Sequence, residues 1–126
     1  VEYQFPDEAI LHVEEEFGTM YFDGASNQYG YGIGVLLIAP FYSCIPLAFK
    51  LRFKVSNNEA EYEACIVGLE AALELGAKRL DVIGDSNLVV SQAKGDWTFK
   101  EEKMRIYHQT LDDLIPQFEK LNFTLL

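Results

Sequence analysis

Three acidic side chains stand at positions in the sequence where catalytic or metal-binding groups are often found. Asp23 follows an aromatic and apolar run and precedes three small residues, and Asp85 follows the run Leu80–Gly84. Glu61 lies near the start of a predicted helix. Carboxylates gathered at ~5–6 Å repel one another by about 3 kcal/mol per pair at an effective dielectric constant of about 20. A fold that brings the three together therefore needs a cation to stabilise them.

The chemistry of such a group depends on its ligand atoms. Carboxylate oxygens without His or Cys favour Mg²⁺ or Mn²⁺ over zinc. Two such ions on either side of a phosphodiester would activate a water molecule and stabilise the leaving oxygen. Two plainer interpretations stay open at this point. The acids can be three unrelated surface residues, and the stretch Tyr21–Ser26 can be a strand that ends in an ordinary Asp-Gly turn.

The strands and helices around these acids are expected to form one α/β domain. We expect strands at residues 17–23, 31–39, 45–53, 80–84 and 121–126, and helices at 57–75, 86–93 and 101–118. Turn residues between the first three strands predict an antiparallel meander, and the helix before the fourth strand predicts a parallel crossover. The expected fold is a mixed five-stranded sheet, three antiparallel strands and then parallel strands, with helices on its faces.

The first predicted helix has a clear start and end. Ser56 and Glu59 have the spacing of a capping box, and Gly76 is typical of the residue after a helix. This places Glu61 in the first turns. Asp23 and Asp85 are both expected at the carboxyl ends of strands that run parallel, so their carboxylates should lie side by side, where open α/β sheets bind ligands.

Length and charge limit the classes of function. A chain of 126 residues fits one domain, and we assign residues 1–16 to an acidic lead-in or linker and 17–126 to the domain. The lead-in holds six acids and no Lys or Arg, so it contributes −6 to the net charge of −10 of the chain. This charge argues against a protein that grips nucleic acid by its phosphates. It does not exclude an enzyme that holds nucleic acid through metal ions.

The sequence shows no recognisable signal peptide or membrane span, and its cysteines lack metal-ligand spacing, so we expect an intracellular protein, cytoplasmic or nuclear. The start is acidic, unlike a signal peptide, and the apolar runs are too short to cross a membrane. Cys44 and Cys65 lie in apolar patterns without metal-ligand spacing, so we expect both thiols to be reduced and buried.

Three motifs together resemble the ribonuclease H family. They are Y-F-D-G-A-S, S-N-N-E-A-E-Y-E-A followed by G-L-E-A-A-L-E-L-G, and V-I-G-D-S-N-L-V-V, in the family's order and spacing. The resemblance covers residues 18–126. It is strongest to the ribonuclease H domains of gypsy-type long-terminal-repeat retroelement polyproteins, of the sort abundant in plant genomes.

The resemblance implies a function and a site. The function would be a metal-dependent endonuclease that hydrolyses the RNA strand of RNA–DNA hybrids and leaves a 3′-hydroxyl, with Mg²⁺ or Mn²⁺ as cofactor. Its partners would be the hybrid, and reverse transcriptase and other polyprotein domains in the parent chain, with no membrane. The implied catalytic and metal-binding residues are Asp23, Glu61 and Asp85. The implied nucleic-acid-binding residues are Gly24, Ala25 and Ser26 in a thin turn that lets ribose hydroxyls approach, Asn57 and Asn58 for the minor groove, and Ser86 after Asp85.

The sequence also departs from the family pattern. The family has a fourth metal-binding Asp in a final helix, after a loop containing His or Arg, and this sequence ends at Leu126 before both. His12 and His108 match nothing in the family and are expected to be surface or packing residues. A catalytically weak or inactive nucleic-acid-binding module with the same fold is therefore the alternative function. An integrase-like transferase is disfavoured, since that class carries its Glu after both Asp residues.

Overall fold

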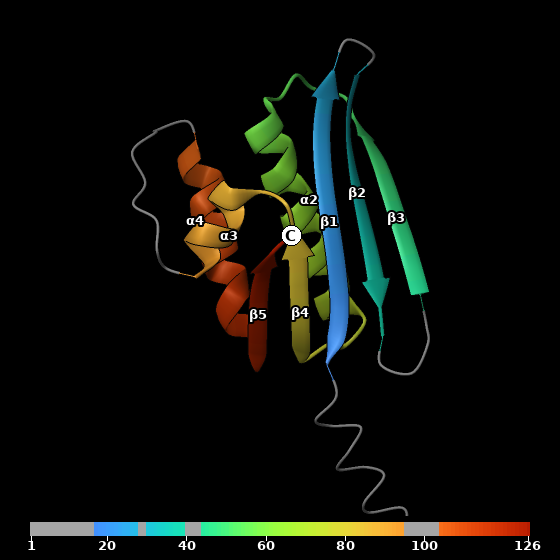
Figure 1. Ribbon diagram of the computed structural model, residues 1–126, viewed down its shortest axis with the longest axis vertical. Coiled ribbons are helices and arrows are strands. Elements are labelled where there is room, and N and C mark those ends of the chain that lie inside the picture. The colour runs from blue at the N-terminus through green and yellow to red at the C-terminus, as the bar shows by residue number, and fades with distance from the viewer. Residues whose placement is uncertain (1–16, 28–29, 40–43, 95–103) are drawn as a thin grey trace, which may run out of the picture.

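The computed structural model describes residues 17–27, 30–39, 44–94 and 104–126 (Figure 1). The strands are β1 (Gly18–Asn27), β2 (Gly30–Ile38), β3 (Cys44–Leu51), β4 (Arg79–Gly84) and β5 (Lys120–Leu125). The helices are α2 (Asn57–Glu74), α3 (Asn87–Ala93) and α4 (Arg105–Leu114), and the 3₁₀ turn η2 (Ile115–Gln117) follows α4. The predicted lead-in at residues 1–16 lies outside the described residues.

The strands form one five-stranded sheet in the order β3-β2-β1-β4-β5. β1 pairs antiparallel with β2, and β2 pairs antiparallel with β3. β4 runs parallel to β1, and β5 runs parallel to β4. The predicted mixed sheet, with a meander followed by parallel strands, is therefore confirmed.

Helix α2 starts and ends at the residues that the sequence indicates. The Ser56 hydroxyl accepts a hydrogen bond from the Glu59 N–H at 3.1 Å, and the Glu59 carboxylate accepts one from the Ser56 N–H at 2.8 Å. Gly76, with φ of 86°, takes the left-handed conformation that glycine adopts without strain. The capping box and the glycine stop are both confirmed.

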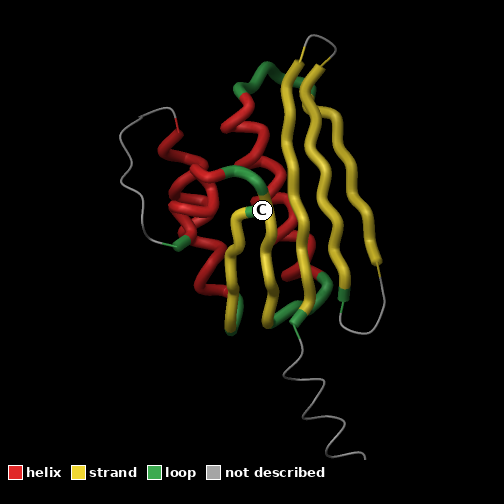
Figure 2. Tube along the Cα trace, viewed as in Figure 1, coloured by secondary structure: helices red, strands yellow, loops and turns green. Residues whose placement is uncertain are grey.

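The three described helices pack together on one face of the sheet (Figure 1, Figure 2). Successive side chains of a strand point to opposite faces, so Met20 and Phe22 of β1 are buried beneath the helices while Tyr21 is 40% exposed on the other side. The largest side chains with no exposed surface come from the sheet and from the helices: Met20, Tyr62, Cys65, Leu69, Val82, Val89 and Leu111. The core thus lies between the sheet and the helix layer.

Two expectations are wrong in detail. β1 does not stop at Asp23, because its pairing with β2 continues to Asn27 opposite Gly30. Gly24 and the two residues after it therefore lie in a strand rather than in a thin turn. Cys44 is exposed because β3 is an edge strand, whereas Cys65 of α2 is buried as expected.

None of the helices in the described part of the chain is both long and apolar enough to cross a membrane.

Candidate metal centre

Asp23 and Asp85 are brought together where two parallel strands separate. The pairing of β1 with β4 ends at Phe22 opposite Gly84, so the two aspartates are the next residues on neighbouring strands. β4 ends there and the chain turns into α3, while β1 continues along β2. The predicted placement of the two acids side by side is confirmed.

Glu61 reaches the same place from helix α2. The N–H of Gly24 donates a hydrogen bond to Glu61 Oε1 at 2.5 Å. A Cβ on Gly24 would overlap the backbone of α2 at Ala60 and come close to Glu61 N. We expected Gly24 to let a ligand approach the main chain, and in the structure it lets a helix do so. The missing side chain allows α2 to lie against β1 and present Glu61 to the aspartates.

The three carboxylates form one compact cluster. Each of Asp23, Glu61 and Asp85 offers an oxygen that lies within 4.8 Å of the others. Glu61 is only 9% exposed, and the two aspartates are exposed.

The electrostatics of Glu61 reflect this crowding. The pKa of Glu61 is raised from 4.5 to about 7, mainly by burial and also by the hydrogen bond with Asp85 and the charges of both aspartates. The Gly24 N–H opposes the rise. At neutral pH the carboxylate is therefore stabilised by taking up either a proton or a cation.

Comparison with known proteins gives the family. The family model described as "Reverse transcriptase-like" matches residues 22–126. The chain belongs to this family. It is 31% identical over 106 residues to ribonuclease HI of Halobacterium salinarum. This match covers 82% of this chain and 53% of the relative. The chain thus spans about half the length of that curated relative.

Solved structures agree with this assignment. The crystal structure of RNase H1 from the same archaeon matches with a TM-score of 0.79 at 28% identity, over 88% of this chain and 86% of that one. The N-terminal RNase H domain of rv2228c from Mycobacterium tuberculosis, solved as a fusion with maltose binding protein, matches with a TM-score of 0.80 at 27% identity, over 88% and 87%. LC11-RNase H1 in complex with an RNA/DNA hybrid has the same fold, with a TM-score of 0.76 at 24% identity, over 86% and 84%. The protein is a ribonuclease H-like domain.

The carboxylate cluster of this ribonuclease H-like domain opens into a cavity of about 590 Å³. Asn57 and Asn58, at the exposed start of α2, line it, and their contact with a minor groove stays a prediction. Ser86 also lines it, but its hydroxyl caps α3 by accepting from the Val89 N–H at 3.3 Å, and the residue is 6% exposed. Capping is therefore the contact that the structure shows for Ser86.

Some residues fall outside the prediction or outside the described region. Asn87, Leu88 and Ser91 of α3 also line the cavity, which the sequence analysis missed. Asn87 and Leu88 lie one turn before Ser91 on a helix that starts two residues after Asp85, and this spacing was the available signal. Ala25 and Ser26 lie further along β1, and the structure does not describe their side chains.

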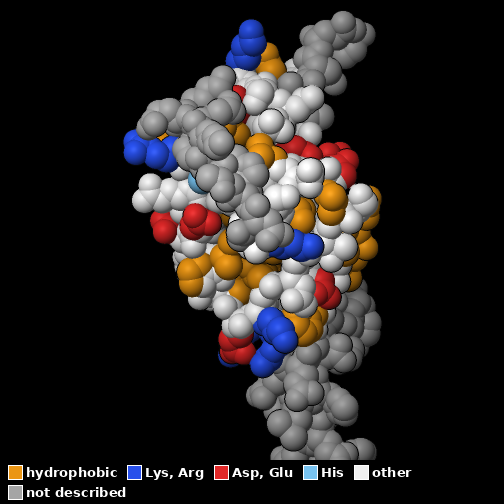
Figure 3. Space-filling model, turned by 60° about the vertical axis from the view of Figure 1, so that its left-hand side comes forward, with side chains coloured by type: hydrophobic (Ala, Val, Ile, Leu, Met, Phe, Trp, Pro, Cys, Tyr) orange, Lys and Arg blue, Asp and Glu red, His pale blue; other side chains and the backbone are white. Residues whose placement is uncertain are grey.

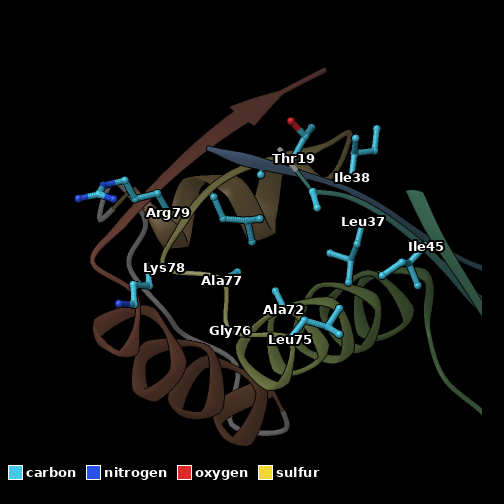
Figure 4. Close-up of a pocket in the computed structure, with 13 residues that line it drawn as sticks. Thr19, Leu37, Ile38, Ile45, Ala72, Leu75, Gly76, Ala77, Lys78 and Arg79 are labelled. Carbon is cyan, nitrogen blue, oxygen red and sulfur yellow. The ribbon is translucent and has the colours of Figure 1, made fainter. Parts of the chain in front are cut away.

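A second cavity, of about 260 Å³, lies at the other end of the sheet, where β1 and β4 begin (Figure 4). Apolar side chains such as Leu37, Ile45 and Leu75 line it, and the charged ends of Lys78 and Arg79 point away from it in Figure 4. It has no acidic, His or Cys lining residue. The three clustered carboxylates of Asp23, Glu61 and Asp85 line the larger cavity instead.

Proposed function

We propose that this domain hydrolyses the RNA strand of RNA–DNA hybrids, with divalent cations held by Asp23, Glu61 and Asp85. The observation that carries the proposal is the convergence of these three carboxylates, from β1, α2 and the end of β4, at one open cavity. Relatives named ribonuclease HI and RNase H1 support it. The LC11 enzyme, solved with an RNA/DNA hybrid, makes such a hybrid the first ligand to test.

The cluster fits hard divalent cations. All of its ligand atoms are carboxylate oxygens, which suit Mg²⁺ or Mn²⁺ better than zinc. Bound there, two cations would supply an activated water molecule and stabilise the leaving oxygen, which gives a 3′-hydroxyl product. Neutralising the three charges would also relieve the repulsion among them.

The residues of the chain have distinct parts in this proposal. Glu61 is fixed from the protein side by the Gly24 N–H, while Asp23 and Asp85 are exposed toward the cavity and accessible to a phosphodiester. Asn57 and Asn58 are exposed at the cavity edge, where their amides can hydrogen-bond to base edges or ribose hydroxyls. The arrangement orients the hybrid around the carboxylates.

Charge suggests how the hybrid is held. On the face drawn in Figure 3, Lys and Arg side chains are spread apart rather than gathered into one basic patch. The chain carries a net charge of −10. Without strong electrostatic attraction to phosphates, binding is expected to depend on the cations.

The parent protein is proposed from the same motifs. Their similarity to gypsy-type retroelement domains, and the description of the matching family, support a place in a long-terminal-repeat retroelement polyprotein of the plant type. Reverse transcriptase would then be a neighbouring domain. The resemblance also implies a fourth carboxylate from a helix after residue 126.

Hybrid cleavage tests the function. A labelled RNA–DNA hybrid is incubated with residues 1–126, and with a protein that continues through the next helix, in Mg²⁺, Mn²⁺ or EDTA. We expect RNA-strand products that end in a 3′-hydroxyl, none in EDTA, and none from Asp85→Asn. Double-stranded DNA should stay intact. Metal-dependent hybrid binding without products from either protein would favour the inactive binding module, and cleavage at the normal rate by Asp85→Asn would contradict the proposed site.

A further inference from the structure

A buried polar network joins the three helices behind the carboxylate cluster. The Tyr62 hydroxyl of α2 donates a hydrogen bond to Gln92 Oε1 of α3 at 2.6 Å. Gln92 Nε2 donates to the carbonyl oxygen of His108 in α4 at 3.0 Å and to Asp112 Oδ1 at 3.2 Å. Tyr62 has no exposed surface, and Gln92 is 9% exposed. The bonds from Gln92 to Tyr62 and His108 are therefore shielded from water, where hydrogen bonds are strong and unpaired groups are costly, while Asp112 is exposed at the edge of the network.

The partners fix the orientation of the Gln92 amide. Its nitrogen faces two acceptors, so its oxygen has to face the Tyr62 hydroxyl, which is then the donor. An apolar residue at position 92 would lose all three contacts. A glutamate would lose both donors and place a second negative charge beside Asp112.

Both ends of the Tyr62–Gln92 hydrogen bond are close in sequence to metal-ligand candidates. Tyr62 follows Glu61 directly. Gln92 lies in the last turn of α3, the seven-residue helix that starts two residues after Asp85. Asp85 and Ser86 connect the start of α3 to Gly84, whose missing side chain leaves room for the ring of Phe22. The direction of α3 thus determines how the chain leaves β4 at Asp85.

We propose that the Tyr62–Gln92 hydrogen bond is a positioning contact that holds Asp85 against Glu61 and thereby sets the cation affinity of the cluster. The inference rests on the proposed metal site. Besides this network, α3 is held by its Ser86 cap and by apolar side chains that pack against the core, which are Leu88, Val89, Val90 and Ala93. Apolar packing is non-directional. A directional bond to α2 is what ties the orientation of α3 to the helix that carries Glu61, and metal ligands tolerate displacements of only about 0.5 Å.

The test is Mn²⁺ affinity in fully folded protein, measured by calorimetry at a temperature where circular dichroism shows every variant to be folded. Tyr62→Phe removes one oxygen and should weaken Mn²⁺ binding about tenfold, the lower end of the range for residues that orient metal ligands. Tyr107→Phe is the matched control. The ring centroids of Tyr107 and Tyr62 lie 5.8 Å apart, but the Tyr107 hydroxyl donates its hydrogen bond to Glu63 of α2, at 3.5 Å, rather than to a residue of α3. The Mn²⁺ affinity of Tyr107→Phe should stay within about twofold of the parent value.

Gln92→Met tests the other end of the same bond. It should weaken Mn²⁺ binding at least as much as Tyr62→Phe, and the double variant should bind no more weakly than Gln92→Met alone, because both changes break one link. Effects that multiply in the double variant would overturn the proposal. So would Tyr62→Phe binding Mn²⁺ as well as the parent protein, and this result would leave the metal site itself intact. A parent protein that does not bind Mn²⁺ would overturn the metal site and this inference together.

Discussion

Removing one acid from the cluster should make the metal-free domain more stable. Asp85→Asn keeps the size of the side chain and removes its charge. The three carboxylate oxygens lie within 4.8 Å of one another, and two charges at that distance repel by about 3 kcal/mol at an effective dielectric constant of about 20. Asp23 and Asp85 are exposed, so solvent screening reduces the gain in the free energy of unfolding to about 1 kcal/mol.

The assay is thermal unfolding at pH 8 in EDTA and in Mg²⁺. In EDTA, Asp85→Asn should unfold about 4 °C above the parent protein. In Mg²⁺ at ten times its dissociation constant, the parent domain should gain about 1.4 kcal/mol, and the variant should gain almost nothing. The two unfolding temperatures should then converge, or their order should reverse.

Asp113→Asn is the control for general charge effects. It removes the same charge from the exposed surface of α4, away from the cluster. Its unfolding temperature in EDTA should change little, and Mg²⁺ should stabilise it as much as the parent protein. The reasoning is refuted if Asp85→Asn lowers the unfolding temperature in EDTA, or if Mg²⁺ stabilises Asp85→Asn and the parent protein equally.

Three further predictions follow from the same geometry. Because burial and the two aspartates raise the pKa of Glu61 to about 7 from 4.5, the metal-free folded state binds more protons than the unfolded chain between these values. Its free energy of unfolding, from urea titrations in EDTA, should fall by about 1–2 kcal/mol between pH 5 and pH 8 after allowance for screening, and Glu61→Gln should remove most of this fall. Gly24→Ala should push α2 away at Ala60, cost about 2 kcal/mol in urea unfolding and weaken Mn²⁺ binding in calorimetry, whereas Gly34→Ala, whose added Cβ meets nothing within 4 Å, should do neither. Ser56→Ala should cost about 1 kcal/mol in urea unfolding by removing the cap of α2, and a fully folded variant with altered Mn²⁺ affinity would contradict the purely capping role.

Features encoded by neighbouring residues could be predicted from the sequence. The capping box of α2 involves only Ser56 and Glu59, and the helix stop needs only the glycine at position 76, so no tertiary information is required. The approach of Asp23 and Asp85 follows from one tertiary rule, that strands joined by a crossover helix run parallel. The helical position of Glu61 then completes the cluster.

Features that depend on distant partners were missed. The Asp-Gly pair suggested that β1 ends at Asp23, but pairing with β2 carries the strand to Asn27. The glycine at position 24 accommodates a helix 37 residues away in the sequence, which no local pattern shows. Gln92 is a polar residue on a short helix and looks like a surface position. It is buried because its side chain lies against α2 and α4, where it bonds to Tyr62 and to the carbonyl oxygen of His108.

The most direct test of the central claim is the position of a bound cation. Crystals of the protein grown or soaked in Mn²⁺ and measured at the manganese absorption edge would locate the ion by its anomalous scattering. We predict an anomalous peak within coordination distance of carboxylate oxygens from Asp23, Glu61 and Asp85 together, and no such peak in Asp85→Asn crystals. A peak elsewhere, or no peak at the cluster at saturating Mn²⁺, would contradict the account.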